Sequence, residues 1–224
     1  MPHIIYLESV TGYSGAENAR RLQLLRSFLR PGFTIELVTT PGGPAILERP
    51  QDFEQAGRAA CAAVAEIPPS RCRAIISAGA VDPGLDALRA IAAVPVIGPG
   101  EASLFLARLV AKRLVILTVG PAVLAARDMI AHVTARPATV IVHTLATTVR
   151  KILADLDAGR RLMREEAAAA VREYRADAIY LGSMTQGSLG IADDLRSELD
   201  IPVFDPMPVS VYAAQEAAAA FGAG

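Results

Sequence analysis

Two segments 104 residues apart each end in a residue that could face a ligand. Ser183 follows the β-rich run 178–181, and Gly79 follows the similar run 74–77. A serine hydroxyl donates hydrogen bonds or acts as a weak acid, and it becomes a nucleophile only beside a base. Glycine has no proton-transfer group, so Gly79 either offers backbone N–H groups to an anion, together with Ala80 and Val81, or is required by the turn.

Two ionisable residues also end predicted strands. Glu8 could hold a cationic group of a ligand, act as a base, or be a solvated acid at the end of its strand. His143 titrates in the range that suits a general base, although a histidine at a strand end is also a common structural residue. Both are therefore candidates for a binding site.

Hydroxyl and backbone donors stand at the same strand ends. Thr118, Val119 and Gly120 precede a predicted helix that starts near Pro121, and exposed N–H groups at a helix start favour a carboxylate. Plain capping of that helix by Thr118 is the alternative interpretation. Ser9, Thr11, Met184 and Thr185 are the remaining candidates.

The elements that must position these residues alternate between strands and helices. Eight β-rich runs are expected at 4–7, 34–39, 74–77, 94–97, 114–117, 139–143, 178–181 and 202–204. Helical patterns lie at 15–29, 52–66, 84–92, 100–112, 121–134, 146–175, 189–199 and 207–221, with a break near Asp157–Gly159. Strands that alternate with helices predict parallel sheets covered by helices on both faces.

An internal repeat divides the chain. Residues 74–79 match 178–183 at an offset of 104, residues 94–99 match 201–206 at an offset of 107, and residues 4–8 match 114–118 at an offset of 110. Three matches in the same order indicate a duplication. We therefore expect an α/β protein of two similar lobes, each with a parallel four-stranded sheet flanked by helices, related by a pseudo-twofold axis across a cleft. Residues 1–98 with 207–224 are assigned to one lobe and residues 99–206 to the other.

Composition excludes several classes of protein. Hydrophobic residues make up 52% and charged residues 20% of the 224 residues, which is typical of a globular chain. A net charge of −1 without a basic cluster argues against nucleic-acid binding, and no apolar run is long enough for a membrane span or a signal peptide. Cys61 and Cys72 are expected to be reduced and structural in a cytoplasmic protein. The sequence contains no metal-ligand cluster and no nucleotide-binding fingerprint, so no cofactor is expected.

Several segments resemble the aspartate/glutamate racemase superfamily, and its hydantoin racemases most closely. The run from Asp82 to Leu85, followed by Pro-Val-Ile-Gly at 95–98, is similar to a family signature in which a cysteine stands three residues before the aspartate. Residues 178–183 resemble the family's Ala-Ile-Val-Leu-Gly-Cys, and residues 43–48 resemble a Gly-Pro-x-Ser-Ile-Glu segment. The resemblance covers nearly the whole chain, and it suggests that Glu48 either shapes the cleft or is merely exposed.

The resemblance implies cofactor-free chemistry at an acidic carbon next to a carboxylate or imide. In such enzymes one cysteine removes the proton from one face, and the other returns a proton to the opposite face. Here Gly79 and Ser183 occupy those two positions, and Glu8-Ser9-Val10-Thr11 replaces the family's Asn-Pro-Asn-Thr loop. The two-cysteine mechanism is therefore absent.

We expect a cofactor-independent, hydantoin racemase-like isomerase that acts on or binds a small α-acidic carboxylate or cyclic imide between the lobes. Its partners are expected to be this small molecule and further copies of the chain in a homo-oligomer, without nucleic acid or membrane. Other interpretations stay open: a lyase similar to arylmalonate decarboxylases, a hydrolase that uses Ser183 with Glu8 or His143 as base, or a non-catalytic binding protein. Ser183 stands in place of the cysteine either through natural loss or through an engineered replacement.

Overall fold

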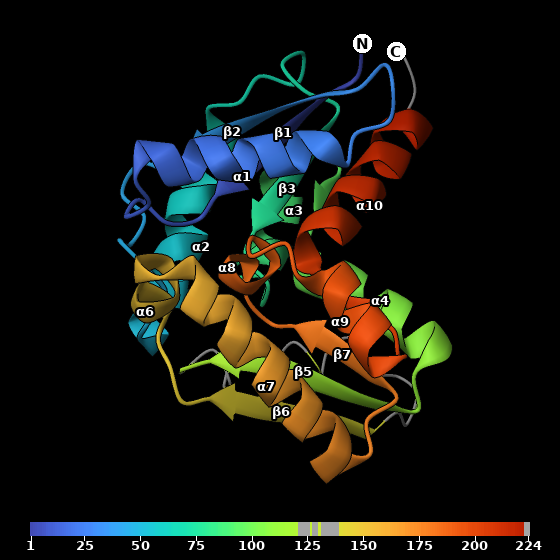
Figure 1. Ribbon diagram of the computed structural model, residues 1–224. Helices are drawn as coiled ribbons and strands as arrows, with labels where there is room; N and C mark the ends of the chain where they lie inside the picture. The colour runs from blue at the N-terminus through green and yellow to red at the C-terminus, as the bar shows by residue number, and fades with distance from the viewer. Residues whose placement is uncertain (121–125, 127–129, 131–138, 222–224) are drawn as a thin grey trace.

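Two parallel four-stranded sheets form the core of the computed structural model, which describes residues 1–120, 126, 130 and 139–221 (Figure 1). The first sheet has the order β2-β1-β3-β4, and the second has the order β6-β5-β7-β8. The strands are β1 (His3–Glu8), β2 (Thr34–Thr39), β3 (Ala74–Ala78), β4 (Val96–Ile97), β5 (Arg113–Val119), β6 (Thr139–Leu145), β7 (Ala178–Leu181) and β8 (Val203–Phe204). All eight predicted strands are present. The central strands are almost wholly buried, which is typical of parallel sheets with helices on both faces.

Helices connect the strands and cover both sheets. They are α1 (Gly15–Ser27), α2 (Pro50–Ala65), α3 (Leu85–Ile91), α4 (Pro99–Val110), α6 (Val149–Ala154), α7 (Leu156–Tyr174), α8 (Met184–Gly187), α9 (Ala192–Leu199) and α10 (Pro206–Ala220). The helix predicted over 121–134 falls outside the described residues, apart from two of them. The short helix α8 was not predicted, because four residues are too few to show a helical period.

The break between α6 and α7 lies earlier than predicted. Asp155 separates the two helices, and its carboxylate caps α7 by accepting the N–H of Ala158 at 2.8 Å. Gly159, predicted near the break, lies inside α7. A Cβ atom on Gly159 would stand 3.0 Å from Cγ2 of Ile152, so this glycine allows α6 and α7 to approach closely rather than ending a helix.

The strand registers reproduce the offsets of the sequence repeat. Ile4 pairs with Ala74 in the first sheet, and Leu114 pairs with Ala178 in the second. Leu114 lies 110 residues after Ile4, and Ala178 lies 104 residues after Ala74, which are the offsets of the sequence repeat. Equivalent strands thus occupy equivalent places in two similar lobes, which confirms the predicted α/β architecture.

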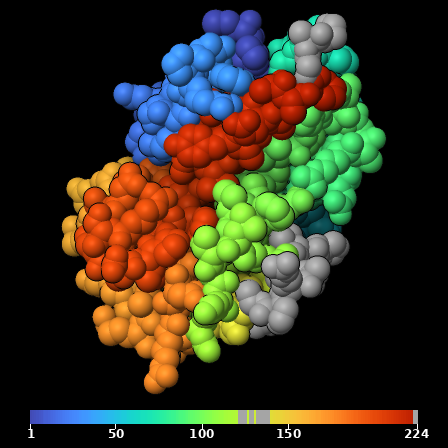
Figure 2. Space-filling model, turned by 90° about the vertical axis from the view of Figure 1, so that its right-hand side faces the viewer, coloured from blue at the N-terminus to red at the C-terminus, as the bar shows by residue number. Residues whose placement is uncertain are grey.

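Helices α4 and α10 join the two lobes. Each follows the edge strand of its own sheet, and the two pack against each other, while α10 also contacts β1, β3 and β4 and α4 contacts β7 (Figures 1 and 2). Gln215 of α10 accepts the N–H of Arg30 at 2.6 Å, which ties the helix to the end of α1. The lobe boundaries proposed from the sequence stay a prediction. None of the helices in the described residues is both long and apolar enough to cross a membrane.

Candidate functional site

A pocket lies where the strands of both sheets end, which is where open parallel sheets bind ligands. Helix α8 lies between the two sheets at this place (Figure 1). Nine of the residues predicted from the sequence line the pocket: Glu8, Ser9, Gly79, Ala80, Val81, Val119, Ser183, Met184 and Thr185. Because Gly79 follows β3 and Ser183 follows β7, each lobe contributes one wall to a single pocket.

The first wall is the loop that begins at Gly79. The N–H of Gly79 donates to the carbonyl of Ser77 at 2.8 Å, so this N–H is not free to bind an anion. A Cβ atom at Gly79 would stand only 2.5 Å from Cδ of Pro83, well inside contact distance. The backbone of Gly79 is not in the left-handed region. The close approach of Pro83 therefore explains why a glycine stands here.

Asp82 holds this loop in place. Its backbone has a φ of +52°, and its buried carboxylate accepts the N–H groups of Gly100 at 2.9 Å and Glu101 at 2.6 Å. These two N–H groups belong to the first turn of α4, where an anion is favoured. Tyr180, in β7, donates its hydroxyl to the carbonyl of Ala80 at 2.6 Å. The first wall is thus anchored both to α4 and to the sheet of the opposite lobe.

The second wall is the start of α8. Ser183 is the N-cap of this helix, and its Oγ accepts the N–H of Thr185 at 3.2 Å. Thr185 in turn bonds the hydroxyl of Tyr13 at 3.1 Å. His143, the histidine proposed as a base, instead places its Nε2 2.9 Å from a carboxylate oxygen of Glu166. Among the described residues, no base hydrogen-bonds the Ser183 side chain, which leaves the hydrolase interpretation without support.

A buried arginine contacts two residues that line the pocket. The side chain of Arg21, on α1, is fully buried, and its Nε donates to Glu17 at 2.8 Å. Its Nη2 donates to Thr185 Oγ1 at 3.2 Å, and the guanidinium lies 3.9 Å from the centre of the Tyr13 ring. Arg21 therefore connects the first lobe to α8 and holds Thr185, two residues after Ser183.

Glu8 brings a buried carboxyl group to the same pocket. Its Oε2 lies 3.7 Å from Nη1 of Arg21, and both atoms are buried without a hydrogen-bond partner. Burial raises the pKa of Glu8 to about 7, although the attraction of Arg21 and the N–H groups of Ser9 and Val10 act in the opposite direction. Burial also raises the pKa of Tyr13, which keeps that phenol protonated at neutral pH. Glu8 is thus able to hold or release a proton near pH 7.

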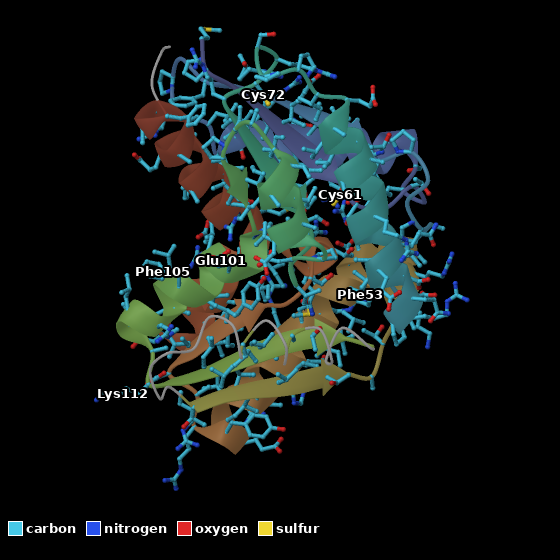
Figure 3. The ribbon with its side chains drawn as sticks, turned by 180° about the vertical axis from the view of Figure 1, so that it is seen from behind. Phe53, Cys61, Cys72, Glu101, Phe105 and Lys112 are labelled. Carbon is cyan, nitrogen blue, oxygen red and sulfur yellow. The ribbon has the colours of Figure 1, made fainter. Side chains whose placement is uncertain are left out.

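Apolar side chains from both lobes form the mouth. Ile46, Leu47 and Phe53 come from the loop after β2 and from α2, and Val149 comes from α6. Figure 3 shows Phe53 at the end of α2 that is nearer the second sheet. Beside them, Glu48 pairs with Arg150 across the two lobes, with 3.3 Å between Oε1 and Nε.

Five predicted residues do not line the pocket: Thr11, Glu48, Thr118, Gly120 and His143. Thr11 is exposed and bonds the carbonyls of Gly43 and Pro44 at 3.3 Å. Thr118 is fully buried. Pro121 and His132 lie outside the described residues.

Some lining and supporting residues were missed in the sequence. The hydrophobic ones, such as Val10 and Ile46, lie in loops where no periodic pattern marks them. Arg21 did leave a signal, because it stands midway between Glu17 and the buried Leu25 at four-residue spacing, on the inner face of α1. A buried arginine requires polar or aromatic partners, and here they are Glu17, Tyr13 and Thr185.

In the described part of the chain, no group of three or more His, Cys, Asp or Glu residues could hold a metal ion. Cys61 and Cys72 are both free thiols. Neither cysteine lines the pocket.

Comparison with known proteins places this geometry in a family. A model of the Asp/Glu/Hydantoin racemase family matches residues 19–214. A hydantoin racemase from Pseudomonas sp. (strain NS671) is 33% identical over 135 residues, which cover 60% of this chain and only 53% of that protein. A hydantoin racemase from Paenarthrobacter aurescens is 30% identical over 195 residues, which cover 82% of this chain and 78% of that protein. The structure of an allantoin racemase from Klebsiella pneumoniae superposes with a TM-score of 0.88 at 25% identity, and the match covers 98% of this chain and 89% of that one.

Proposed function

Because the chain belongs to the Asp/Glu/Hydantoin racemase family, we propose that it removes and returns the acidic proton of a small neutral cyclic imide. A 5-substituted hydantoin is the type of substrate that we have in mind, bound in the pocket between the two lobes. The reaction would need neither a metal ion nor an organic cofactor, since the carbon between a carbonyl and an amide nitrogen of such a ring is already acidic.

The observation that carries this proposal is the chemical character of the lining. In the part of the chain that the structure describes, the lining contains one acid, Glu8, and no arginine, lysine or histidine. A ligand carboxylate would meet a buried acid without a cation in direct contact, which is unfavourable away from water. A neutral imide avoids that cost, so the lining favours an imide over the carboxylate that the sequence also allowed.

The apolar mouth supports the same substrate class. Ile46, Leu47, Phe53 and Val149 offer a hydrophobic surface that could receive the substituent of the ring. Hydantoin and allantoin, which appear in the names of the similar proteins, are both small rings of this imide type. The opposite walls at Gly79 and Ser183 would then face the two sides of the ring.

The proposal is tested by proton exchange in heavy water. Each enantiomer of 5-benzylhydantoin is incubated with the protein near neutral pD in the presence of EDTA, and loss of the ring C5 proton is followed by NMR. We expect exchange above the protein-free rate, and we expect L- and D-glutamate to show none. Exchange of glutamate without exchange of any hydantoin would refute the imide proposal.

A variant of the mouth tests where the substituent binds. Phe53→Ala removes an aromatic contact that a benzyl group would make, so we expect 5-benzylhydantoin to bind about ten-fold more weakly, equivalent to ~1.4 kcal/mol. Binding of 5-methylhydantoin, whose substituent is too short to need Phe53, should change much less. Equal losses for both compounds would place the substituent elsewhere.

A further inference from the structure

The two positions that face the ring carry no group suited to removing a proton. Gly79 has no side chain, and the Oγ of Ser183 caps α8. Among the described lining residues, two side chains ionise: Glu8 and Tyr13. The hydroxyl of Tyr13 bonds Thr185 Oγ1 at 3.1 Å, and burial raises its pKa further above the neutral range. Glu8 is therefore the lining residue best suited to accept a proton at neutral pH.

We propose that Glu8 is the catalytic base of this pocket and that it acts from the first wall, in place of the missing thiol. This inference rests on the proposed function. It concerns a residue that stands outside the two positions where the chain resembles a two-cysteine enzyme.

The position of Glu8 in the sheet supports this role. Glu8 is the last residue of β1, and it pairs with Ala78, the residue directly before Gly79. Glu8 therefore stands on the strand beside the one that leads into Gly79, at the same edge of the first sheet. Glu8 and Gly79 thus reach the pocket from adjacent strands of one sheet, and both line it.

One oxygen of the Glu8 carboxyl group has no hydrogen-bond partner in the protein. Oε2 of Glu8 is buried and has no hydrogen-bond partner, because Nη1 of Arg21 is 3.7 Å away, beyond hydrogen-bond distance. An acceptor left unpaired in a buried site is costly unless it has a function or an unseen partner. Rotation of the carboxyl group from Arg21 toward the pocket would bring this oxygen to the acidic proton of a bound ring.

The charges around Glu8 suit a base that works near neutral pH. Arg21 and Glu17 face it from α1, Tyr6 lies on the same strand, and Tyr13 lies in the following loop. Burial raises the pKa of Glu8 to about 7, and Arg21 limits that rise. A base whose pKa lies near the working pH combines sufficient ionisation with sufficient basicity.

The proton transfer balances within the ring and this carboxyl group. The C–H bond at the acidic carbon breaks, its electron pair moves onto the ring carbonyl as an enolate, and Oε of Glu8 gains the proton. After that proton exchanges with solvent, the carboxylic acid returns a proton to the same carbon. Thr118, which lies 110 residues after Glu8 at the equivalent position of β5, cannot act as a base from the other wall. The protein should therefore exchange the proton faster than it inverts the carbon.

The test compares three variants in the heavy-water assay. Glu8→Gln keeps the shape of the side chain but cannot accept the proton, so exchange of 5-benzylhydantoin should fall about 10²–10⁴-fold, the usual contribution of a placed base. Binding, measured by calorimetry, should change no more than about three-fold. Asp205→Asn is the matched control, because Asp205 is also a buried acid with a raised pKa but does not line the pocket, and exchange should stay within a few-fold.

Glu8→Asp keeps a negative charge beside Arg21 and is the second variant should Glu8→Gln fold poorly. It should fold, and withdrawing the carboxylate by one methylene group should slow exchange at least ten-fold. The exchange rate of the unaltered protein should rise with pH through an inflection near 7, and Glu8→Gln should remove that inflection.

The outcomes separate the two proposals. Exchange that persists in well-folded Glu8→Gln, with its pH inflection intact, would overturn the assignment of Glu8 and leave the imide function standing. Inversion as fast as exchange in the unaltered protein would also overturn it, since one base on one wall returns the proton to the same face. Failure of the unaltered protein to bind or exchange any hydantoin would instead refute the proposed function, and the assignment of Glu8 with it.

Discussion

Adding one methyl group at Gly79 tests the explanation of the first wall. The Cβ of Gly79→Ala would stand 2.5 Å from Cδ and 3.0 Å from Cγ of Pro83, whereas carbon atoms pack best at about 3.5–4.0 Å. The loop or the proline ring must therefore move by about 1 Å. Overpacking of this kind costs about 1–3 kcal/mol, and for a chain of this size each kcal/mol lowers the melting temperature by roughly 2–4 °C. We expect a decrease of about 2–12 °C.

Pro83→Ala should relieve the clash, because it deletes both ring atoms that meet the new methyl group. Alone, this change should cost about 0.4–1 kcal/mol through a more flexible unfolded chain. Together, the two changes should cost less than the sum of the single ones, by about 1–2 kcal/mol. Gly15→Ala is the control, since nothing lies within 4 Å of a Cβ at Gly15.

Thermal and urea unfolding of the four proteins measure these effects. Gly15→Ala should be neutral or slightly stabilising. Additive costs for the changes at Gly79 and Pro83, or a harmless Gly79→Ala, would show that Pro83 is not the reason for the glycine. Gly79→Cys meets the same obstacle, so rebuilding a thiol on this wall should also require Pro83→Ala.

Two further predictions concern the thiols and the buried acids. Replacing Cys61 and Cys72 together by alanine should leave the exchange rate within a few-fold, because neither cysteine lines the pocket. Both lie in the first lobe, and Cys72 lies at the end of the molecule far from the second sheet (Figure 3). Loss of exchange in a folded double variant would place the site elsewhere. Burial raises the pKa of Glu8 and Asp82 to about 7 and that of Asp205 to about 6, so these groups keep protons in the folded chain that the unfolded chain releases above about pH 4. The free energy of unfolding should therefore fall as pH rises from 5 to 8, by up to about 1.4 kcal/mol per pH unit for each proton, and urea titrations that show a rise instead would contradict these shifts.

The architecture was predictable from the sequence because the signals that encode it are repeated. The eight strands and most of the helices follow from hydrophobic runs, and the offsets of 104 and 110 residues reappear in the pairing of Ala74 with Ile4 and of Ala178 with Leu114. Helix α8 was not predicted because four residues show no period, and the α6–α7 break was predicted two residues or more too late, near Asp157–Gly159. Asp155 forms the break, and Gly159 lies inside α7, where a side chain would meet Ile152.

Residues of the pocket lining were predictable where they stand at or just after the end of a strand. Glu8, Gly79 and Ser183 were located in this way, since strand ends meet at one edge of each sheet. The residues that determine their chemistry come from elsewhere: Arg21 on α1 sets the charge near Glu8, and Pro83 excludes a side chain at Gly79. The period of α1 places Arg21 on its inner face, but which residues Arg21 and Pro83 contact depends on the folded chain.

In each lobe an acidic side chain caps a helix and packs closely against a glycine, but the acid stands at a different place in the sequence of the two lobes. Asp82 caps α4, and a Cβ atom on Gly98 would lie 2.7 Å from its Cγ. Asp205 caps α10, and a Cβ atom on Gly187 would likewise meet its Oδ1. Each lobe thus pairs one acid with one glycine, but the acid lies in the strand-end loop of the first lobe and directly before the helix in the second.

The pocket shows the same divergence where it affects chemistry. The equivalent strand ends carry Glu8 in one lobe and Thr118 in the other, and the equivalent walls carry Gly79 and Ser183. An enzyme that inverts a carbon needs a proton-transfer group on each face, which a symmetric scaffold provides most simply by repeating one residue type. Here the first lobe carries an acid, Glu8, and the second carries the hydroxyl groups of Thr118 and Ser183. Because the scaffold is symmetric and its ionisable groups are not, the chemistry that we propose is one-sided proton exchange.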